Sequence, residues 1–274
     1  MDERPVLFFD SGIGGLTILR EVRVLIPEMQ FIYVADDAGF PYGNWEENVL
    51  KKRISTIFTN LLTRYEPTLC VIACNTVSTL MMKDLRQNFP HVPFVGTVPA
   101  IKLAAEQTKS GLISVLATPG TVKRAYTNEL INSFARQCHV KLVASEKLAR
   151  FAEDYLRGKS IDLEELRKEI LPCFVEKDGK YTDIIVLACT HYPFLINFFR
   201  EQALWSVEWI NPAKAIAKHT KSLLPLSGKI YQQPIKKYQD FALLTSKNIT
   251  SSTEYLLKEF GLKLMKGVDF GILN

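Results

Sequence analysis

The chain has 274 residues, of which 47% are hydrophobic and 23% are charged, a composition ordinary for a globular protein with a sizeable core. Its net charge of +5 favours an anionic ligand, but no block of Lys and Arg resembles a nucleic-acid-binding stripe. No signal peptide is expected, because the first residues lead directly into a predicted strand, and the longest uncharged run (184–199) is too short and too polar to span a bilayer. Neither nucleic acid nor a membrane is therefore expected as a partner.

Apolar runs and helical patterns alternate along the chain. Strands are predicted at 6–9, 31–35, 69–73, 94–98, 112–116, 140–144, 184–188 and 241–245. Helices are predicted from about 16, over 45–64, around 77–85, after 99, after 121, over 147–156 and 163–174, from 193, and over 252–260. This alternation predicts an α/β fold with mostly parallel sheets flanked by helices. No linker rich in Pro or Ser divides the chain, so two closely apposed lobes are expected.

Polar and nucleophilic residues follow the predicted strands at their carboxyl ends, where α/β sheets bind ligands. They are Asp10, Ser11, Tyr42, Cys74, Asn75, Thr76, Thr118, Thr121, Cys189, Thr190 and His191. The first group, Asp10-Ser-Gly-Ile-Gly-Gly15, is a turn that opens a helix. It differs from a dinucleotide-binding loop because Thr17 replaces the third glycine and Asp10 would repel a phosphate. A nucleotide site is therefore not expected here.

Two cysteine segments form a near-repeat: Val71-Ile-Ala-Cys-Asn-Thr76 and Val186-Leu-Ala-Cys-Thr-His191. Each cysteine lies one residue past an apolar strand, at a predicted helix start, where the pKa of a thiol is lowered. The other cysteines, at 70, 138 and 173, are interpreted as small core residues. The spacing of the five fits neither a disulfide framework nor a zinc site, and it predicts reduced thiols in the cytoplasm.

Cys74 and Cys189 are compatible with a redox pair, a metal pair or two proton-transfer groups. A redox pair would favour a C-x-x-C motif, and a metal would need more ligands than His191 adds. Two similar thiols suit inversion of a stereocentre, because one base removes a proton while a like group supplies one to the opposite face. Asp10 and His191 are candidate helpers, with a helix N-cap and a core histidine as the structural alternatives. For Asp36 and Asp37, a structural role as turn residues is as compatible with the sequence as a functional role.

The chain closely resembles the glutamate racemases of the aspartate/glutamate racemase superfamily. The matching segments are Phe9-Asp-Ser-Gly-Ile-Gly-Gly-Leu16, Pro41-Tyr-Gly43, Ala73-Cys-Asn-Thr76, Val98-Pro-Ala-Ile-Lys102, Leu116-Ala-Thr-Pro-Gly-Thr-Val-Lys-Arg124 and Ala188-Cys-Thr-His-Tyr-Pro193. Two departures are Gly39, which stands where the family usually has Arg, and the poorly matching segment before Glu153.

The resemblance implies interconversion of L- and D-glutamate without a cofactor or metal, supplying D-glutamate for peptidoglycan, cell-wall biogenesis and cell shape. It implies that Cys74 deprotonates the D enantiomer with help from Asp10, and Cys189 the L enantiomer with help from His191 and Glu153. The implied substrate contacts are Asp10, Ser11, Tyr42, Gly43, Asn75, Thr76, Thr118, Thr121, Thr190 and His191.

The resemblance also implies the organisation of the chain and its partners. It predicts two pseudo-symmetric lobes, one formed by 1–97 with 209–274 and the other by 98–208. It suggests a homodimer and an activator that is a cell-wall precursor. Two other functions remain open. One is an aspartate racemase or a related two-cysteine isomerase, and the other is a catalytically silent amino-acid-binding protein, which would not need both cysteines.

Overall fold

The computed structural model describes residues 4–224, 238–247 and 249–272. The chain forms two compact units, one of residues 1–97 with 213–274 and the other of residues 98–212. Each unit is built on a parallel sheet with helices packed against it, so the predicted α/β fold class is confirmed. Within the described residues, no helix is long and apolar enough to cross a membrane.

The first unit contains a six-stranded sheet in the order β12-β11-β2-β1-β3-β4. The strands are β1 (Val6–Asp10), β2 (Phe31–Ala35), β3 (Leu69–Ile72), β4 (Phe94–Gly96), β11 (Phe241–Leu244) and β12 (Lys263–Met265). All of its pairings are parallel. The central strands β1, β2 and β3 are buried at every position, which explains why they are continuous apolar runs in the sequence.

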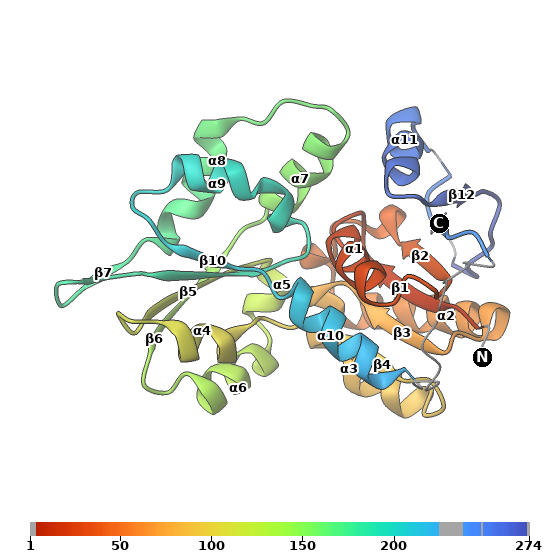
Figure 1. Ribbon diagram of the computed structural model, residues 1–274, viewed down its shortest axis with the longest axis horizontal. Helices are drawn as coiled ribbons and strands as arrows, with labels where there is room; N and C mark the ends of the chain where they lie inside the picture. The colour runs from red at the N-terminus through yellow and green to blue at the C-terminus, as the bar shows by residue number, and fades with distance from the viewer. Residues whose placement is uncertain (1–3, 225–237, 248, 273–274) are drawn as a thin grey trace. The chain divides into compact units, whose positions relative to one another are not determined.

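The helices of the first unit are α1 (Leu16–Leu25), α2 (Glu47–Tyr65), α3 (Asn75–Asn88), α10 (Ala213–Leu223) and α11 (Ser251–Glu259). Helices α2 and α3 share an apolar core with Leu7, Phe9 and Ile72 of the sheet. Phe9 and Phe58 lie 4.9 Å apart between ring centroids, and burying each such ring contributes roughly 1.5–3 kcal/mol. Figure 1 shows α10 lying along α1, which brings residues 213–223 back to the first unit.

The second unit contains a four-stranded parallel sheet in the order β10-β9-β5-β6. Its strands are β5 (Leu112–Ala117), β6 (His139–Ala144), β9 (Ile184–Ala188) and β10 (Glu208–Ile210). Its helices are α4 (Ile101–Gln107), α5 (Pro119–Val122), α6 (Ala125–Phe134), α7 (Leu148–Leu156), α8 (Leu163–Ile170) and α9 (Ile196–Gln202). Helices α4 and α6 cover one face, packing on Ile113, Val115 and Val186.

Several elements differ from the sequence prediction. The helix predicted to run to residue 174 ends at Ile170, and a 3₁₀ turn containing Pro172 follows, because proline cannot continue the hydrogen-bond ladder. Helix α10 was not predicted. Residues 209–212 group with the second unit because β10 pairs with β9, whereas the sequence analysis assigned them to the first lobe.

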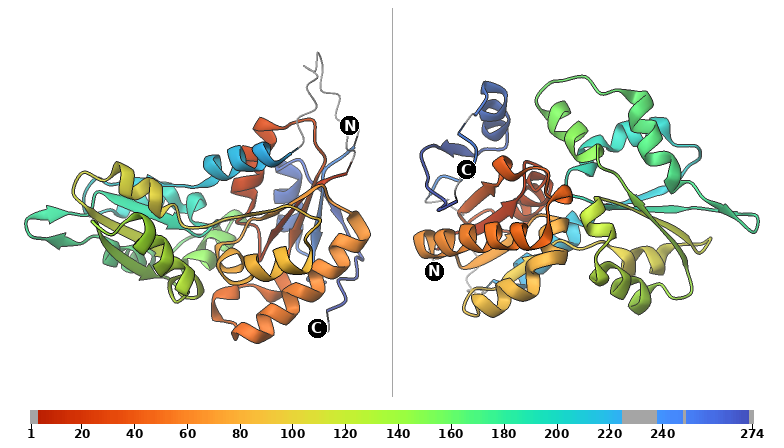
Figure 2. Two further views of the ribbon diagram at one scale, coloured as in Figure 1. Left: turned by 90° about the horizontal axis from the view of Figure 1, so that it is seen from below. Right: turned by 180° about the vertical axis from the view of Figure 1, so that it is seen from behind.

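A hairpin in the second unit was also not predicted. Strands β7 (Glu176–Lys177) and β8 (Lys180–Tyr181) pair antiparallel, and Figure 2 shows them projecting from the second unit. Asp178 and Gly179 both have positive φ angles, as a type I′ hairpin turn requires. The Asp-Gly pair was therefore a visible signal for this hairpin.

Candidate active site

Four polar side chains follow neighbouring strands at the carboxyl edge of the first sheet. Backbone bonds continue the ladders past the strand ends: the N–H of Asp36 donates to the carbonyl of Asp10 at 2.8 Å, and the N–H of Ala73 to that of Phe9 at 2.8 Å. The N–H of Thr245 donates to the carbonyl of Ala35 at 3.1 Å. The parallel register thus brings Asp10, Asp36, Cys74 and Thr245 to one edge of the sheet.

Asp10 is fully buried and organises the turn after β1. Its Oδ1 accepts the N–H of Ser11 and its Oδ2 that of Gly15, both at 2.7 Å, and such donors stabilise an ionised carboxylate. Gly15 lies so close to β3 that an added Cβ would be 2.7 Å from the Cβ of Ala73. Only glycine therefore lets this turn pack beside the strand that leads to Cys74.

Cys74 occupies the N-cap position of α3 and is 6% exposed. Its Sγ lies 3.9 Å from the hydroxyl of Ser11, and the unpaired N–H groups of a helix N-terminus favour an anion at this position. Asn75 and Thr76 form the first turn of α3 and are buried. The amide oxygen and nitrogen of Asn75 have no hydrogen-bond partner within the described residues. They are available to a polar ligand, since buried polar atoms are usually paired.

Tyr42 and Gly43 lie in a 3₁₀ turn, Tyr42–Asn44, that follows β2. The buried hydroxyl of Tyr42 donates to Oδ2 of Asp36. Burial, reinforced by the Asp36 carboxylate and the nearby Cys74, raises the pKa of Tyr42 well above its ordinary value. The phenol therefore stays protonated and acts as a donor.

The carboxyl edge of the second sheet repeats this arrangement of strand ends. Ala117 pairs with Ala144 on one side and with Ala188 on the other, so the residues after β5, β6 and β9 lie at one edge. Thr118 follows β5 and caps α5, with its hydroxyl 3.2 Å from that of Thr121. Cys189, Thr190 and His191 follow β9 and are all buried.

A chain of buried polar contacts leads away from Cys189. Its Sγ lies 3.7 Å from Nδ1 of His191, and Nε2 of His191 lies 2.8 Å from Oε1 of Glu153 on α7. The other oxygen of Glu153 forms a 2.5 Å ion pair with Arg157. Burial alone would lower the pKa of His191, but its hydrogen bonds and charge interactions with Cys189 and Glu153 raise it well above its ordinary value. The raised pKa of His191 places a positive charge beside Cys189.

The two cysteines therefore have different surroundings. Cys74 lies at the N-terminus of a 14-residue α-helix. Cys189 does not, because the residues after His191 form a 3₁₀ turn, Tyr192–Leu195, before α9, so the predicted helix start at Pro193 was not accurate. In the second unit the imidazole of His191 lies beside the cysteine, where the first unit has the N-terminus of α3. Glu153 contacts His191 although the sequence around it matches the family poorly.

Sequence reasoning missed several residues that contact the candidate groups. Arg53 and Thr245 bind the carboxylate of Asp36, and Arg157 binds that of Glu153. Tyr192 is fully buried, and burial together with the nearby Cys189 raises its pKa. A tyrosine directly after the Cys-Thr-His motif was visible in the sequence. Arg53 and Arg157 lie in predicted helices, and no local sequence pattern indicates which carboxylate each one binds.

The remaining cysteines have no comparable surroundings. Cys70 and Cys173 are buried, and burial raises the pKa of each thiol, in keeping with the predicted core role. Cys138 is only partly buried against the α4–α6 core, because it precedes the edge strand β6. None of the five cysteines forms a disulfide, and no group of three His, Cys, Asp or Glu that could hold a metal occurs within the described ranges.

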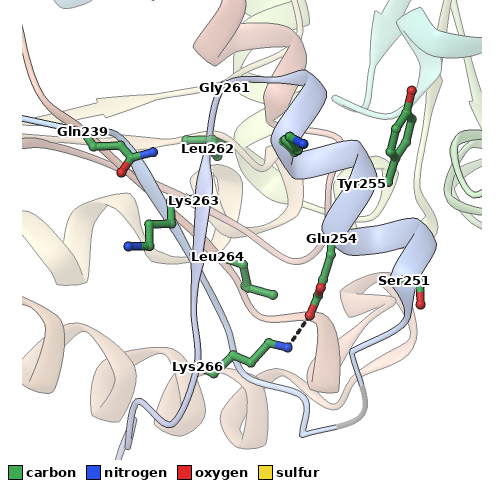
Figure 3. Close-up of a pocket in the computed structure, with 10 residues that line it drawn as sticks. Gln239, Ser251, Glu254, Tyr255, Gly261, Leu262, Lys263, Leu264 and Lys266 are labelled. Carbon is green, nitrogen blue, oxygen red and sulfur yellow. Dashed lines mark ion pairs between the residues drawn. The ribbon is translucent and has the colours of Figure 1, made fainter.

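A surface pocket of the first unit lies apart from these groups. Figure 3 shows it between α11 and β12, with side chains including Gln239, Tyr255 and Lys263, and with an ion pair between Lys266 and Glu254. None of the candidate site residues lines it. It is therefore not part of the candidate site.

Two parallel α/β units, each with a buried cysteine beyond the end of a strand, define the fold class, and comparison with known proteins identifies the family. Residues 44–220 match the family model for Asp/Glu/Hydantoin racemase, which covers more than half of the chain. The chain belongs to the Asp/Glu/Hydantoin racemase family, as the sequence resemblance indicated.

Relatives of this chain are named glutamate racemase. One from Bartonella tribocorum is 86% identical over 272 residues and covers 99% of each chain, and one from Brucella canis is 58% identical over 261 residues, with 95% of this chain and 94% of the relative covered. The structure also matches a crystal structure of Escherichia coli glutamate racemase in complex with L-glutamate and the activator UDP-MurNAc-ala. That match has a TM-score of 0.85 at 34% identity and covers 95% of this chain and 97% of the other.

Proposed function

We propose that this protein interconverts L- and D-glutamate by proton transfer between two thiols, without a cofactor or metal, and supplies D-glutamate for peptidoglycan in the cytoplasm. One observation carries the proposal: in each unit a buried strand ends at a cysteine that contacts a hydrogen-bonding side chain, Ser11 for Cys74 and His191 for Cys189. Free cysteines fit a reducing compartment. The choice of glutamate rests on the relatives.

The proposed reaction breaks one C–H bond and forms another on the opposite face. One cysteine acts as a thiolate and takes the α-proton, so an S–H bond forms as the C–H bond breaks. The second cysteine, still a thiol, then gives its proton to the carbanion from the other side. By the family resemblance, Cys74 removes the proton of D-glutamate and Cys189 that of L-glutamate. The stereocentre inverts, and the enzyme is left with its two protonation states exchanged.

The α-proton of an amino acid is very weakly acidic, so charge must be stabilised as it moves onto the substrate carboxylate. Hydroxyl and amide donors at the two sheet edges are suited to this task. They are Ser11, Asn75, Thr76, Thr118, Thr121 and Thr190. The amide of Asn75 is the strongest structural support, since neither its oxygen nor its nitrogen has a hydrogen-bond partner within the described residues and both are available to a polar ligand.

Purified protein is expected to convert L-glutamate to an equal mixture of enantiomers, with little or no turnover of L-aspartate. The change in circular dichroism of each amino acid over time measures this directly. Faster turnover of aspartate would identify an aspartate racemase instead. Binding of glutamate by calorimetry without any change in optical signal would identify a catalytically silent binding protein.

An activator is also proposed. The Escherichia coli relative was crystallised with UDP-MurNAc-ala, and the segments Val98-Pro-Ala-Ile-Lys102 and Gly120-Thr-Val-Lys-Arg124 resemble the activator-dependent type. Adding UDP-N-acetylmuramoyl-alanine is expected to raise the racemisation rate, with UDP-N-acetylglucosamine as the control nucleotide sugar. An unchanged rate over a full titration would contradict this regulation while leaving the racemase assignment intact.

A further inference from the structure

A buried carboxylate, Asp36, lies at the centre of a network beneath the Tyr42–Gly43 turn. Asp36 is fully buried. Arg53 of α2 donates to both of its oxygens, from Nε at 2.7 Å and from Nη2 at 2.6 Å. The hydroxyls of Thr245 and Tyr42 also donate to it, that of Thr245 at 2.5 Å. Four donors on one carboxylate form a charge-balanced and fully paired cluster, which is the condition under which buried charges are tolerated.

The network joins three segments that are distant in the sequence. Thr245 follows β11, and its hydroxyl also accepts the N–H of Ala38 at 3.1 Å. The neighbouring Ser246 donates its N–H to Asp37 at 2.9 Å. The end of β11 therefore holds Asp36 and Asp37, while α2 holds Asp36 from the other side through Arg53.

Arg53 also contacts the loop that carries Tyr42 and Gly43. Its guanidinium lies over the ring of Trp45, 5.5 Å from the ring centroid. The indole N–H of Trp45 donates to the carbonyl of Gly39 at 2.8 Å. The guanidinium thus contacts the 36–45 loop at Asp36 and Trp45, and Trp45 in turn fixes Gly39.

Because Gly39 has no side chain, the network can occupy the space beside it. A Cβ added at Gly39 would lie 2.8 Å from Oδ2 of Asp36, 2.9 Å from the Tyr42 ring and 3.0 Å from Nε of Arg53. The first two distances are shorter than real Cβ contacts and the third lies at the limit, and the three atoms belong to the cluster itself. A side chain at this position would require the cluster to shift, which gives a physical reason for glycine here.

We propose that Arg53 and Thr245 are positioning residues that fix the Tyr42–Gly43 turn through Asp36 and thereby set the affinity of the site for its substrate. The inference rests on the proposed function, in which Tyr42 and Gly43 contact glutamate. Neither residue exchanges a proton in that mechanism. Loosening the turn therefore weakens binding of the ground state and the transition state alike, which raises KM and leaves kcat nearly unchanged.

The test compares Arg53→Met and Arg53→Lys with a matched control, Arg23→Met. Arg23 also pairs with a buried aspartate, Asp240, at 2.8 Å, and likewise ties the C-terminal segment to the first unit. Asp240 accepts the N–H of Phe31 at the start of β2, whereas Asp36 follows the end of that strand. The control therefore removes a similar ion pair at the opposite edge of the same sheet.

Arg53→Met is expected to raise KM for both glutamate enantiomers by about tenfold or more, since it leaves a buried carboxylate unpaired. Arg53→Lys keeps the charge but not the two-pronged contact, so it should recover thermal stability while KM stays raised. Arg23→Met should lower thermal stability and leave KM unchanged. Equal KM values for wild type and both Arg53 variants would overturn the proposal. A rise in KM in Arg23→Met as large as that in Arg53→Met would also overturn it.

Hydrogen–deuterium exchange of the backbone amides of 37–45 provides a readout that does not depend on turnover. Faster exchange is expected in Arg53→Met and in Thr245→Val, but not in Arg23→Met. If the wild type racemised no glutamate, the proposed function would fail while this measurement still decided the positioning role. Unchanged exchange in the Arg53 variants would overturn the positioning role even in an active racemase.

Discussion

Serine in place of Cys74 or of Cys189 is expected to lower the rate of racemisation by about 10²–10⁴-fold, the range typical of a lost acid–base group. Serine preserves the size and position of the side chain, but its hydroxyl is a far weaker acid than a thiol and does not supply the basic form near neutral pH. Cys138→Ser is the matched control, because Cys138 is free, partly buried and outside the candidate site.

Deuterium incorporation at the α-carbon separates the two thiols. In D₂O, wild type should exchange the α-proton of both enantiomers. Cys74→Ser should lose exchange of D-glutamate most strongly, and Cys189→Ser that of L-glutamate, as followed by NMR of each enantiomer. The two-thiol mechanism is wrong if both single variants racemise glutamate at the wild-type rate.

Replacing Glu153 by glutamine is expected to have the second largest effect, because it removes the carboxylate 2.8 Å from Nε2 of His191. The pKa of His191 is raised by its hydrogen bonds with Cys189 and Glu153, so losing one of them lowers it. Less imidazolium at neutral pH means less positive charge beside Cys189 in the proposed mechanism. The basic limb of the pH–rate profile should therefore move to lower pH, with a drop in kcat of about 10²-fold at neutral pH.

The pH dependence of kcat measures this shift, with Glu165→Gln as the control. Glu165 pairs with Lys147 and Lys168 at the surface of α8 and contacts no candidate group, so its replacement should leave the profile unchanged.

The pH dependence of folding stability gives a second measurement, because proton binding and folding are linked. Because the folded-state pKa of His191 is raised, its stabilising contribution is present at low pH and is lost as pH rises through that pKa. Glu153→Gln should reduce this contribution, and identical stability–pH curves would contradict the role of Glu153.

Much of the fold was predictable because buried parallel strands are apolar along their whole length. β1, β3 and β9 were identified in this way, and so were the polar residues that directly follow them. Local sequence also placed Cys74 at a helix start. These features depend on residues that are neighbours in the chain, and the family resemblance added Glu153.

The contacts between distant segments were not predictable. Nothing in the sequence of α2 singles out Arg53 as the partner of Asp36, and nothing near Thr245 indicates that its hydroxyl reaches the same carboxylate. Arg157 has one turn of helix between it and Glu153, a spacing shared by many surface pairs. Such pairings depend on how helices and strands pack, which a single sequence does not encode in any local pattern.

The unequal surroundings of the two cysteines meet a thermodynamic constraint. L- and D-glutamate are mirror images of equal free energy in water, so their equilibrium constant is unity, and kcat/KM must be the same in both directions for any variant at any pH. The imidazolium beside Cys189 cannot favour one direction. In the proposed mechanism the free enzyme has two forms that differ in which cysteine holds the proton, and only the form with Cys189 deprotonated is ready for the L enantiomer. After each conversion of L to D the enzyme is left in the other form, and at high substrate concentration the return of that proton becomes a step of the catalytic cycle.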